Sequence, residues 1–207
     1  SLDGLVRALF ADHGLAPPRT LGLSTCLDGF VRSGPASLRD QLESLAEAFS
    51  FRGIDTGEAI LLAALDRRPA ATIRAADLVE EDADEPLVVR TRREDEALPR
   101  ERRLVHLDSG RDFETATALA QRVDGASRGV ATADVAAAMP DGLARQTAEI
   151  ALADAWAGRT RVALKLPRRR LAIAPGDVLS LALDGAPEEV LVEETEDAGR
   201  LLVAART

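Results

Sequence analysis

The chain has 207 residues and a net charge of −9, with 46% apolar and 29% charged residues. This length allows one large domain or two small ones with a real hydrophobic core, and the composition is ordinary for a globular protein. The acidic balance argues against a general nucleic-acid-binding surface, which needs a basic stripe. No stretch approaches the roughly 18 uninterrupted apolar residues of a membrane span.

Both ends of the chain resemble cut points. The start, SLDGLVRALF, has neither the basic segment nor the long apolar core of a signal peptide, so we expect synthesis in the bacterial cytoplasm. It also lacks an initiator Met, and the final LLVAART is typical of a strand. These features favour a piece of a longer protein.

The first block of the chain predicts two helices. Residues 2–12 carry apolar side chains at helical spacing, with Gly14 as a C-cap and two prolines after it. Ser37 is a predicted N-cap for a second helix. The apolar face of that helix is expected to consist of Leu38, Leu42, Leu45, Ala46 and Phe49.

A hairpin is predicted to follow the second helix. Residues 51–54 and 59–65 are strand-like and flank an Asp-Thr-Gly turn, and a third short strand is expected around 71–73. Together these elements predict a helix-plus-hairpin α+β domain over residues 1–82.

The segment EEDADEP, residues 80–86, interrupts these patterns. Its carboxylates could bind a hard cation, but Ca²⁺ loops need alternating ligands and a central Gly that are missing here. A solvated connector is the favoured interpretation. We therefore place a domain boundary between residues 82 and 83.

The second block, residues 83–207, is expected to be rich in strands and to contain one Ala-rich helix. Strands are predicted at 87–93 and 103–107 with a charged loop between them, residues 113–123 fit either a strand or a helix, and 141–156 predict a helix that Gly158 ends. Later strand signals cover 161–166, 171–174, 178–183, 189–193 and 201–205. Short strands separated by Gly or Pro indicate a small β-barrel or sandwich. The fold class expected for the whole chain is α+β.

The sequence contains few residues or motifs that are typical of a catalytic site. GLSTC, residues 22–26, lacks the final Gly of a hydrolase nucleophile elbow. His13 is expected at a helix end and His106 in a strand, both in structural roles, although either could still join a triad in space. Cys26, the only cysteine, is expected to be a buried small hydrophobe.

Metal, sugar and phosphate sites are also weakly supported. His106, Asp108 and Asp112 could ligate a metal, but a strand end followed by an Asp-Ser-Gly turn explains them equally well and is favoured. A glycosidase-like carboxylate pair stays open, although the carboxylates crowd into loops. Trp156 is the only tryptophan and is expected in the core, which leaves a sugar-stacking platform poorly supplied. The arginines at 168–170 are expected to be solvated. We therefore predict no catalytic residue, no cofactor and no metal.

One turn stands out in the stretch LAIAPGDVLSLALDG, residues 171–185. Pro175 suits the second position of a type I or II turn, and Gly176 can take the positive φ that a type II turn needs. Asp177 can accept backbone N–H groups as the next strand begins. We expect Pro175, Gly176 and Asp177 to form a structural corner that lets two strands close a small barrel.

The order of elements around this turn resembles phage tail proteins. A helix ending in Trp (ALADAWAGRT), a strand closing in LP (VALKLP), the segment LAIAPGDVLSLAL and a hairpin like VLVEETEDAGRLLVAA follow one another as in that family. Upstream, SLRDQLESLAEAFSFRGIDTGEAILLAA is similar to its α+β portion. The resemblance covers most of the chain and is strongest to the tail-tip, baseplate-hub-like proteins of alphaproteobacterial gene transfer agents.

The resemblance implies small β-barrels with an accompanying α+β domain. It also implies a structural virion component, located at the tail tip, that assembles as a homotrimer with tail-tip and tail-tube proteins around a channel for DNA. An acidic lining suits such a channel because it repels phosphate, so no stable nucleic-acid binding is expected. The alternatives are a carbohydrate-binding module or a module associated with a cell-wall hydrolase, either of which would serve host attachment.

Overall fold

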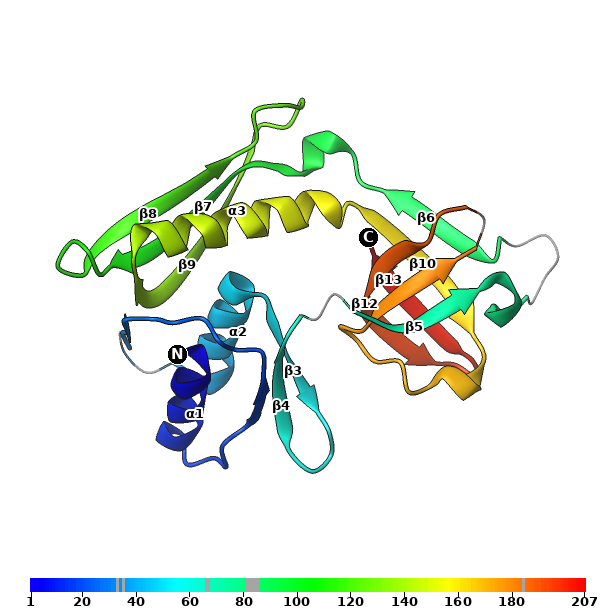
Figure 1. The fold of residues 1–207 in the computed structure, drawn as a ribbon, viewed down its shortest axis with the longest axis horizontal. Helices are drawn as coiled ribbons and strands as arrows, with labels where there is room; N and C mark the ends of the chain where they lie inside the picture. Colours follow the sequence, from blue (N-terminus) through cyan, green and yellow to red (C-terminus); the bar gives the residue numbers. More distant parts are fainter. Residues whose placement is uncertain (33, 35, 66–67, 81–85, 184) are drawn as a thin grey trace. The chain divides into compact units, whose positions relative to one another are not determined.

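The protein folds into two units, each built from two separate stretches of chain (Figure 1). In a computed structural model, residues 1–207 are described except 33, 35, 66–67, 81–85 and 184. Unit 1 comprises Ser1–Leu65 and Asp95–Asp154, and unit 2 comprises Asp66–Glu94 and Ala155–Thr207. This division differs from the expected single boundary between residues 82 and 83. The acidic segment at that boundary lies largely outside the described residues.

Unit 1 begins with the two predicted helices, which are confirmed. Helix α1 (Leu2–Asp12) is capped by the Ser1 side chain, and α2 (Leu38–Phe49) starts with a capping box between Ser37 and Asp40. The buried side of α2 is rotated from the predicted face, because its buried residues are Gln41, Leu45 and Ala48.

A small sheet follows the helices in unit 1. The predicted hairpin is present as β3 (Phe51–Asp55) and β4 (Ile60–Ala64), and β1 (Arg19–Leu21) lies parallel to β4. The third expected strand exists as β5 (Pro69–Arg74) but belongs to unit 2, where it pairs in parallel with β11 (Val178–Ala182). A strand of the first block is thus completed by a partner about a hundred residues later, which the local pattern cannot reveal.

The second sheet of unit 1 has the order β2-β9-β7-β8 over the described residues. Its strands are β2 (Gly29–Phe30), β7 (Pro99–Asp108), β8 (Glu114–Gln121) and β9 (Gly129–Met139). The ambiguous segment 113–123 therefore contains a strand, β8, and residues 99–102, expected in a charged loop, belong to β7. Strand β9 was not predicted, because its alanine-rich sequence carries little β-propensity.

Helix α3 (Asp141–Ala157) confirms the predicted Ala-rich helix and runs along this sheet (Figure 1). Alternate side chains of β7, such as Leu104 and His106, are buried, as are Ala144 and Ala148 of α3. Apolar side chains on the opposite face of the sheet, including Leu119 on β8, stay exposed. The core of unit 1 thus lies on one side of the sheet only.

Unit 2 is formed around a six-stranded sheet with the order β5-β11-β12-β13-β10-β6 among the described residues. The remaining strands are β6 (Val88–Arg92), β10 (Thr160–Leu166), β12 (Glu188–Asp197) and β13 (Leu201–Arg206). One face of the sheet encloses a core that includes Leu166, Leu179 and Val190. The prediction of a strand at 171–174 was wrong. The chain forms the short 3₁₀ turn η3 (Arg168–Arg170) and then continues to residue 177 without being assigned to a strand.

The strand ladder of unit 2 is open between β5 and β6 over the described residues. Two contacts join parts of unit 2 that are not neighbours in the ladder: the Val79 N–H, beyond the end of β5, donates to the Lys165 carbonyl on β10 over 2.9 Å, and Arg90 on β6 pairs with Glu188 on β12 at 3.1 Å. The fold is therefore a mixed α+β arrangement with a curled sheet in place of a hydrogen-bonded closed barrel. Among the helices that the structure describes, none is long and apolar enough to cross a membrane.

Candidate structural corner and binding surfaces

The predicted corner residues form a hydrogen-bonded β-turn. The Asp177 N–H donates to the Ala174 carbonyl over 3.1 Å, and Gly176 has φ of 87°. A positive φ at the third residue, after Pro at the second, is the type II arrangement. The Asp177 carboxylate also accepts the Ala174 N–H at 2.9 Å, so this side chain closes the turn from within.

The corner is joined to strand β12 through its backbone. The Gly176 N–H donates to the Val192 carbonyl at 2.6 Å, and the Val192 N–H donates to the Asp177 carbonyl at 2.8 Å. Val192 is buried, and a β-bulge follows it in the pairing of β12 with β13. The turn therefore fixes where β11 begins and in which register it meets β12.

Arginines of η3 were expected to be solvated; Arg168 and Arg169 are exposed, and all three also form ion pairs with carboxylates. Arg168 lies 2.8 Å from Asp197, and Asp77 lies 3.1 Å from Arg170 and 3.6 Å from Arg169. The Arg74 backbone N–H donates to Asp77 over 3.1 Å. This backbone hydrogen bond, followed by the one from Arg170, holds the pKa of Asp77 below its ordinary value.

Replacing Asp77 with Asn should lower the melting temperature at neutral pH and leave it nearly unchanged in acid. A carboxyl whose folded pKa is depressed stabilises the fold above its unfolded pKa and loses that contribution as the pH falls through the folded pKa. The gap between parent and variant, measured by thermal unfolding from pH 7 downward, should therefore close below about pH 4.

Repeating the Asp77 series in about 1 M salt should shrink the gap only partly, because salt screens the arginines more than it weakens the backbone hydrogen bond. A gap that stays constant across the whole pH range would show that Asp77 contributes only through packing.

The residues singled out for chemistry have mainly structural surroundings. Cys26 is exposed in the segment after β1, contrary to the expectation of burial. This segment has little regular structure and leaves the thiol near the Ser24 carbonyl, 3.8 Å away. His13 contacts the Leu9 carbonyl through Nδ1 at 2.8 Å. His106 is buried, with no hydrogen-bond partner for Nε2 among the described residues.

The possible metal ligands after β7 serve a turn. The Asp108 carboxylate accepts the Gly110 N–H at 2.9 Å, and Asp112 has a φ of 51° in the loop that follows. No group of three His, Cys, Asp or Glu side chains suited to a metal occurs within the part of the chain that the structure describes. Trp156 is buried, as predicted.

A shallow groove of about 280 Å³ lies on the outer face of unit 2, across β6, β10, β13 and β12. We call it the outer groove. Cross-strand pairs align its floor, because Ala163 faces Val89 on one side and Ala204 on the other. Further lining residues include Leu87, Lys165, Leu202, Glu194 and Glu196. The result is an apolar floor with charged residues at its edge, typical of a contact surface.

A smaller cavity of about 170 Å³ lies in unit 1 where α2 begins. Phe30, Val31 and Ala136 supply its apolar wall, together with Gln41. The Gln41 Nε2 donates to the Ala36 carbonyl at 3.0 Å, while its buried Oε1 has no partner among the described residues. The described residues that line this cavity form no arrangement of nucleophile, base and acid.

The sequence and the fold were compared with known proteins. Residues 37–195 match the family described as "Putative phage tail protein". The chain belongs to this family. The predicted resemblance is therefore confirmed, and the protein is a structural protein of phage-tail type. It matches no curated protein sequence.

Three solved structures show how far the likeness extends. A component of the virion of a native gene transfer agent particle is 25% identical, with a TM-score of 0.87 over 100% of this chain and 47% of that one. The tail protein from Neisseria meningitidis MC58 is 11% identical, with a TM-score of 0.67 over 100% of this chain and 66% of that one. The 43 kDa tail protein of prophage MuSo2 from Shewanella oneidensis is 11% identical, with a TM-score of 0.63 and coverages of 100% and 65%. This phage tail protein thus spans from about half to just under two thirds of the chains it matches.

Sequence reasoning missed several of the features that this phage tail protein presents at its surface. The outer groove could not be predicted from the sequence, because its residues come from four strands that pair across long stretches of chain. The link from Asp77 to Arg169 and Arg170 likewise joins distant segments. One local signal was available: the DSGRDFE stretch after β7 combines turn residues with an aromatic side chain.

Proposed function

We propose that this chain is a structural component of a phage-like tail tip, the hub of a baseplate, that joins the tail tube to the tip around a DNA channel. The observation that carries the proposal is the match of the entire chain to a component of a gene transfer agent virion, at 25% identity and a TM-score of 0.87. On this proposal the chain works at the tail tip as part of a homotrimer and contacts other tail-tip and tail-tube proteins.

The architecture of the two units suits assembly into a ring. The six-stranded sheet of unit 2 is open, and the ion pair between Arg90 and Glu188 connects its edge strand β6 to β12 across the sheet. The outer groove and the exposed face of the β2-β9-β7-β8 sheet offer surfaces for neighbouring subunits. On this view Pro175, Gly176 and Asp177 are architectural, because they position β11 in the curled sheet.

We propose that the chain has no catalytic activity of its own. His106 is buried and the Asp108 carboxylate is bound by a backbone N–H, so neither is presented to a substrate. The alternative of carbohydrate binding is less well supported because Trp156 is buried and unavailable for stacking on a sugar.

A reconstruction of the intact particle tests the proposed function directly. We expect density for this fold in a closed ring around the tail axis, with threefold symmetry, between the tube and the tip. Density for the fold in a peripheral fibre, or its absence from the particle, would overturn the proposal.

The purified chain should bind duplex DNA weakly or not at all at physiological salt, because its charge of −9 repels phosphate. Fluorescence anisotropy with a labelled duplex, measured across a salt series, checks this expectation. A micromolar complex that weakens steeply with salt would show instead that the arginines form a nucleic-acid groove, which is incompatible with a channel that must release DNA.

A further inference from the structure

The hairpin between β7 and β8 ends in a turn with an unusual sequence. The Glu114 N–H donates to the Arg111 carbonyl at 3.0 Å, and the two central residues, Asp112 and Phe113, have φ of 51° and 61°. Positive φ at both central positions is the type I′ arrangement, which strongly prefers Asn-Gly or Asp-Gly. A bulky aromatic residue with positive φ is a genuine outlier, since its Cβ crowds the backbone.

The remainder of the loop holds this strained conformation in place. The Asp108 carbonyl accepts N–H groups from Phe113 at 2.9 Å and from Arg111 at 3.1 Å. The buried Asp108 carboxylate accepts the Gly110 N–H, and the Ser109 N–H donates to the Met139 carbonyl at 3.3 Å. Backbone strain persists where the surroundings over-determine it, and such strain is concentrated at functional positions.

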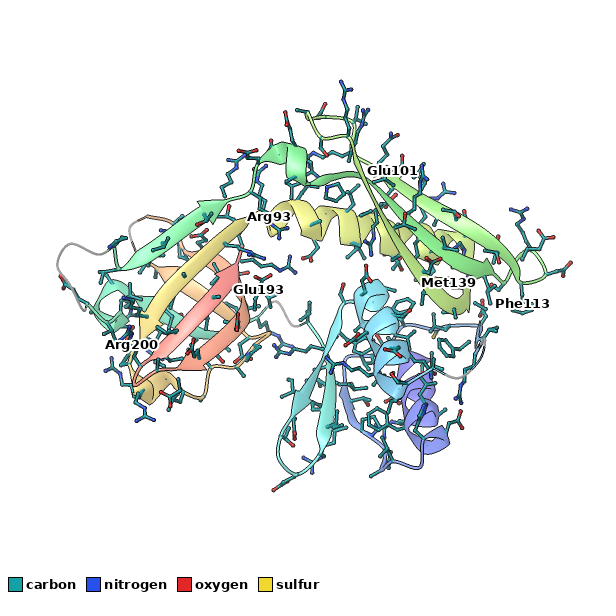
Figure 2. All side chains as sticks on the ribbon, turned by 180° about the vertical axis from the view of Figure 1, so that it is seen from behind. Arg93, Glu101, Phe113, Met139, Glu193 and Arg200 are labelled. Atoms are coloured by element: carbon teal, nitrogen blue, oxygen red, sulfur yellow. The ribbon has the colours of Figure 1, made fainter. Side chains whose placement is uncertain are left out.

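The strained turn presents an aromatic ring to solvent. Phe113 lies at the outer end of the hairpin and is 56% exposed (Figure 2), whereas Phe10 and Phe51 are at most 5% exposed. Glycine would fit this backbone without strain but would supply no side chain. A rigid, exposed aromatic side chain loses little freedom on binding, which makes it a good anchor in an interface.

The charges around the ring define the chemistry of its partner. Asp112 and Glu114 flank Phe113, and Glu114 lies 3.5 Å from Arg111 in an exposed pair. The Asp112 carboxylate has no hydrogen bond or ion pair among the described residues. The tip is therefore an apolar knob between two carboxylates, of which only Glu114 is paired with Arg111, so this collar keeps a net negative charge. Anionic lipid headgroups would repel this collar, whereas a protein pocket with a basic rim would attract it.

We propose that Phe113 is an anchor that inserts into an apolar pocket, rimmed by Arg or Lys, on an adjoining protein of the particle. The strain in the turn is retained because it aims the ring outward from a fixed hairpin end. This inference rests on the proposed function only in that the partner is another particle component.

Three substitutions in the turn separate anchoring from folding. Phe113→Gly and Asp112→Gly both relieve the positive φ, so both variants should melt at or above the temperature of the parent protein. Only Phe113→Gly removes the ring. In intact particles carrying the full protein, we expect incorporation of Phe113→Gly to fall by about tenfold or more. Asp112→Gly should stay within about threefold of the parent, and Phe113→Leu should restore most of the loss.

The outcomes distinguish this inference from the proposed function. Absence of the parent chain from particles would overturn the proposed function and the inference with it. Incorporation of Phe113→Gly at the parent level would overturn the inference alone.

A photo-crosslinking amino acid at position 113 identifies the contact. In particles, it should form a crosslink to another virion protein within a segment that contains apolar residues flanked by Arg or Lys. The same group at Ile60, exposed at the start of β4, is the matched control and should not label that segment. Crosslinking to an acidic segment would overturn the proposal. Sedimentation of the purified chain with phosphatidylglycerol vesicles that requires Phe113 would also overturn it, in favour of membrane insertion.

Discussion

Replacing Leu179 with alanine should lower the free energy of unfolding of unit 2 by about 2–5 kcal/mol, the range for removing a fully buried leucine side chain. Leu179 is completely buried in β11, where it faces Val190 on β12 and Ala71 on β5. Strands β12 and β5 pair with β11 on its two sides. The surrounding structure can therefore relax only a little to fill the cavity that the substitution leaves.

Urea unfolding followed by Trp156 fluorescence measures this effect, because the only tryptophan of the chain belongs to unit 2. The matched control is Leu171→Ala, the same change at a side chain that is 44% exposed in the same unit. The control should change stability by less than about 0.5 kcal/mol. Equal effects of the two substitutions would contradict the assignment of Leu179 to the core.

Replacing Gly176 with valine should destabilise the fold by about 1–3 kcal/mol, the scale of forcing a residue with a Cβ into a sparsely populated backbone region. Gly176 has φ of 87°, and its N–H donates to the Val192 carbonyl, so a turn that relaxes to negative φ also loses its connection to β12. The change should act on stability alone, because we assign the corner an architectural role.

Gly176→Asn is the matched control for the corner, since it adds a side chain that tolerates positive φ in a type II turn. Calorimetric melting should rank the parent first, the Asn variant second and the Val variant last. Identical melting of the Val variant and the parent would exclude the type II turn. A loss of particle function in either variant without a change in melting would instead make the corner a contact site.

Local signals predicted the elements whose boundaries are written into the nearby sequence. The Ser37 cap marks the start of α2, Gly14 follows the end of α1, and Gly158 follows the end of α3. The turn at Pro-Gly-Asp could be predicted for the same reason, because the φ values that Pro and Gly permit depend on the residue type itself. These effects act within a few residues, so no knowledge of the fold was needed.

Long-range pairing accounts for the expectations that differed. Strand β5 follows the first hairpin in sequence yet pairs with β11, and residues 95–154 return to the unit that the N-terminal segment began. The acidic stretch at 80–86 predicted a connector between domains and lies largely outside the described residues; composition alone does not distinguish a connector within a unit from one between units.

The tertiary structure also decided which side chains are buried and which are exposed to solvent. Cys26 is exposed in the irregular stretch between β1 and β2, and β9 forms through its pairing with β7 and its contact with α2. The strained Phe113 turn depends on the buried Asp108 for its backbone partners. None of these environments exists in the isolated segment.

By itself, the sequence determined the helices, the Ser37 cap, the position of the corner turn, the α+β class and membership of the phage tail family. These follow from residue-level conformational preferences and from the order of the elements. Only the tertiary structure decided the division into two discontinuous units, the open curled sheet, the outer groove and the outward aim of Phe113. The physical reason is that strand pairing and burial are set by contacts between residues far apart in the chain, and those contacts exist only after the chain has folded.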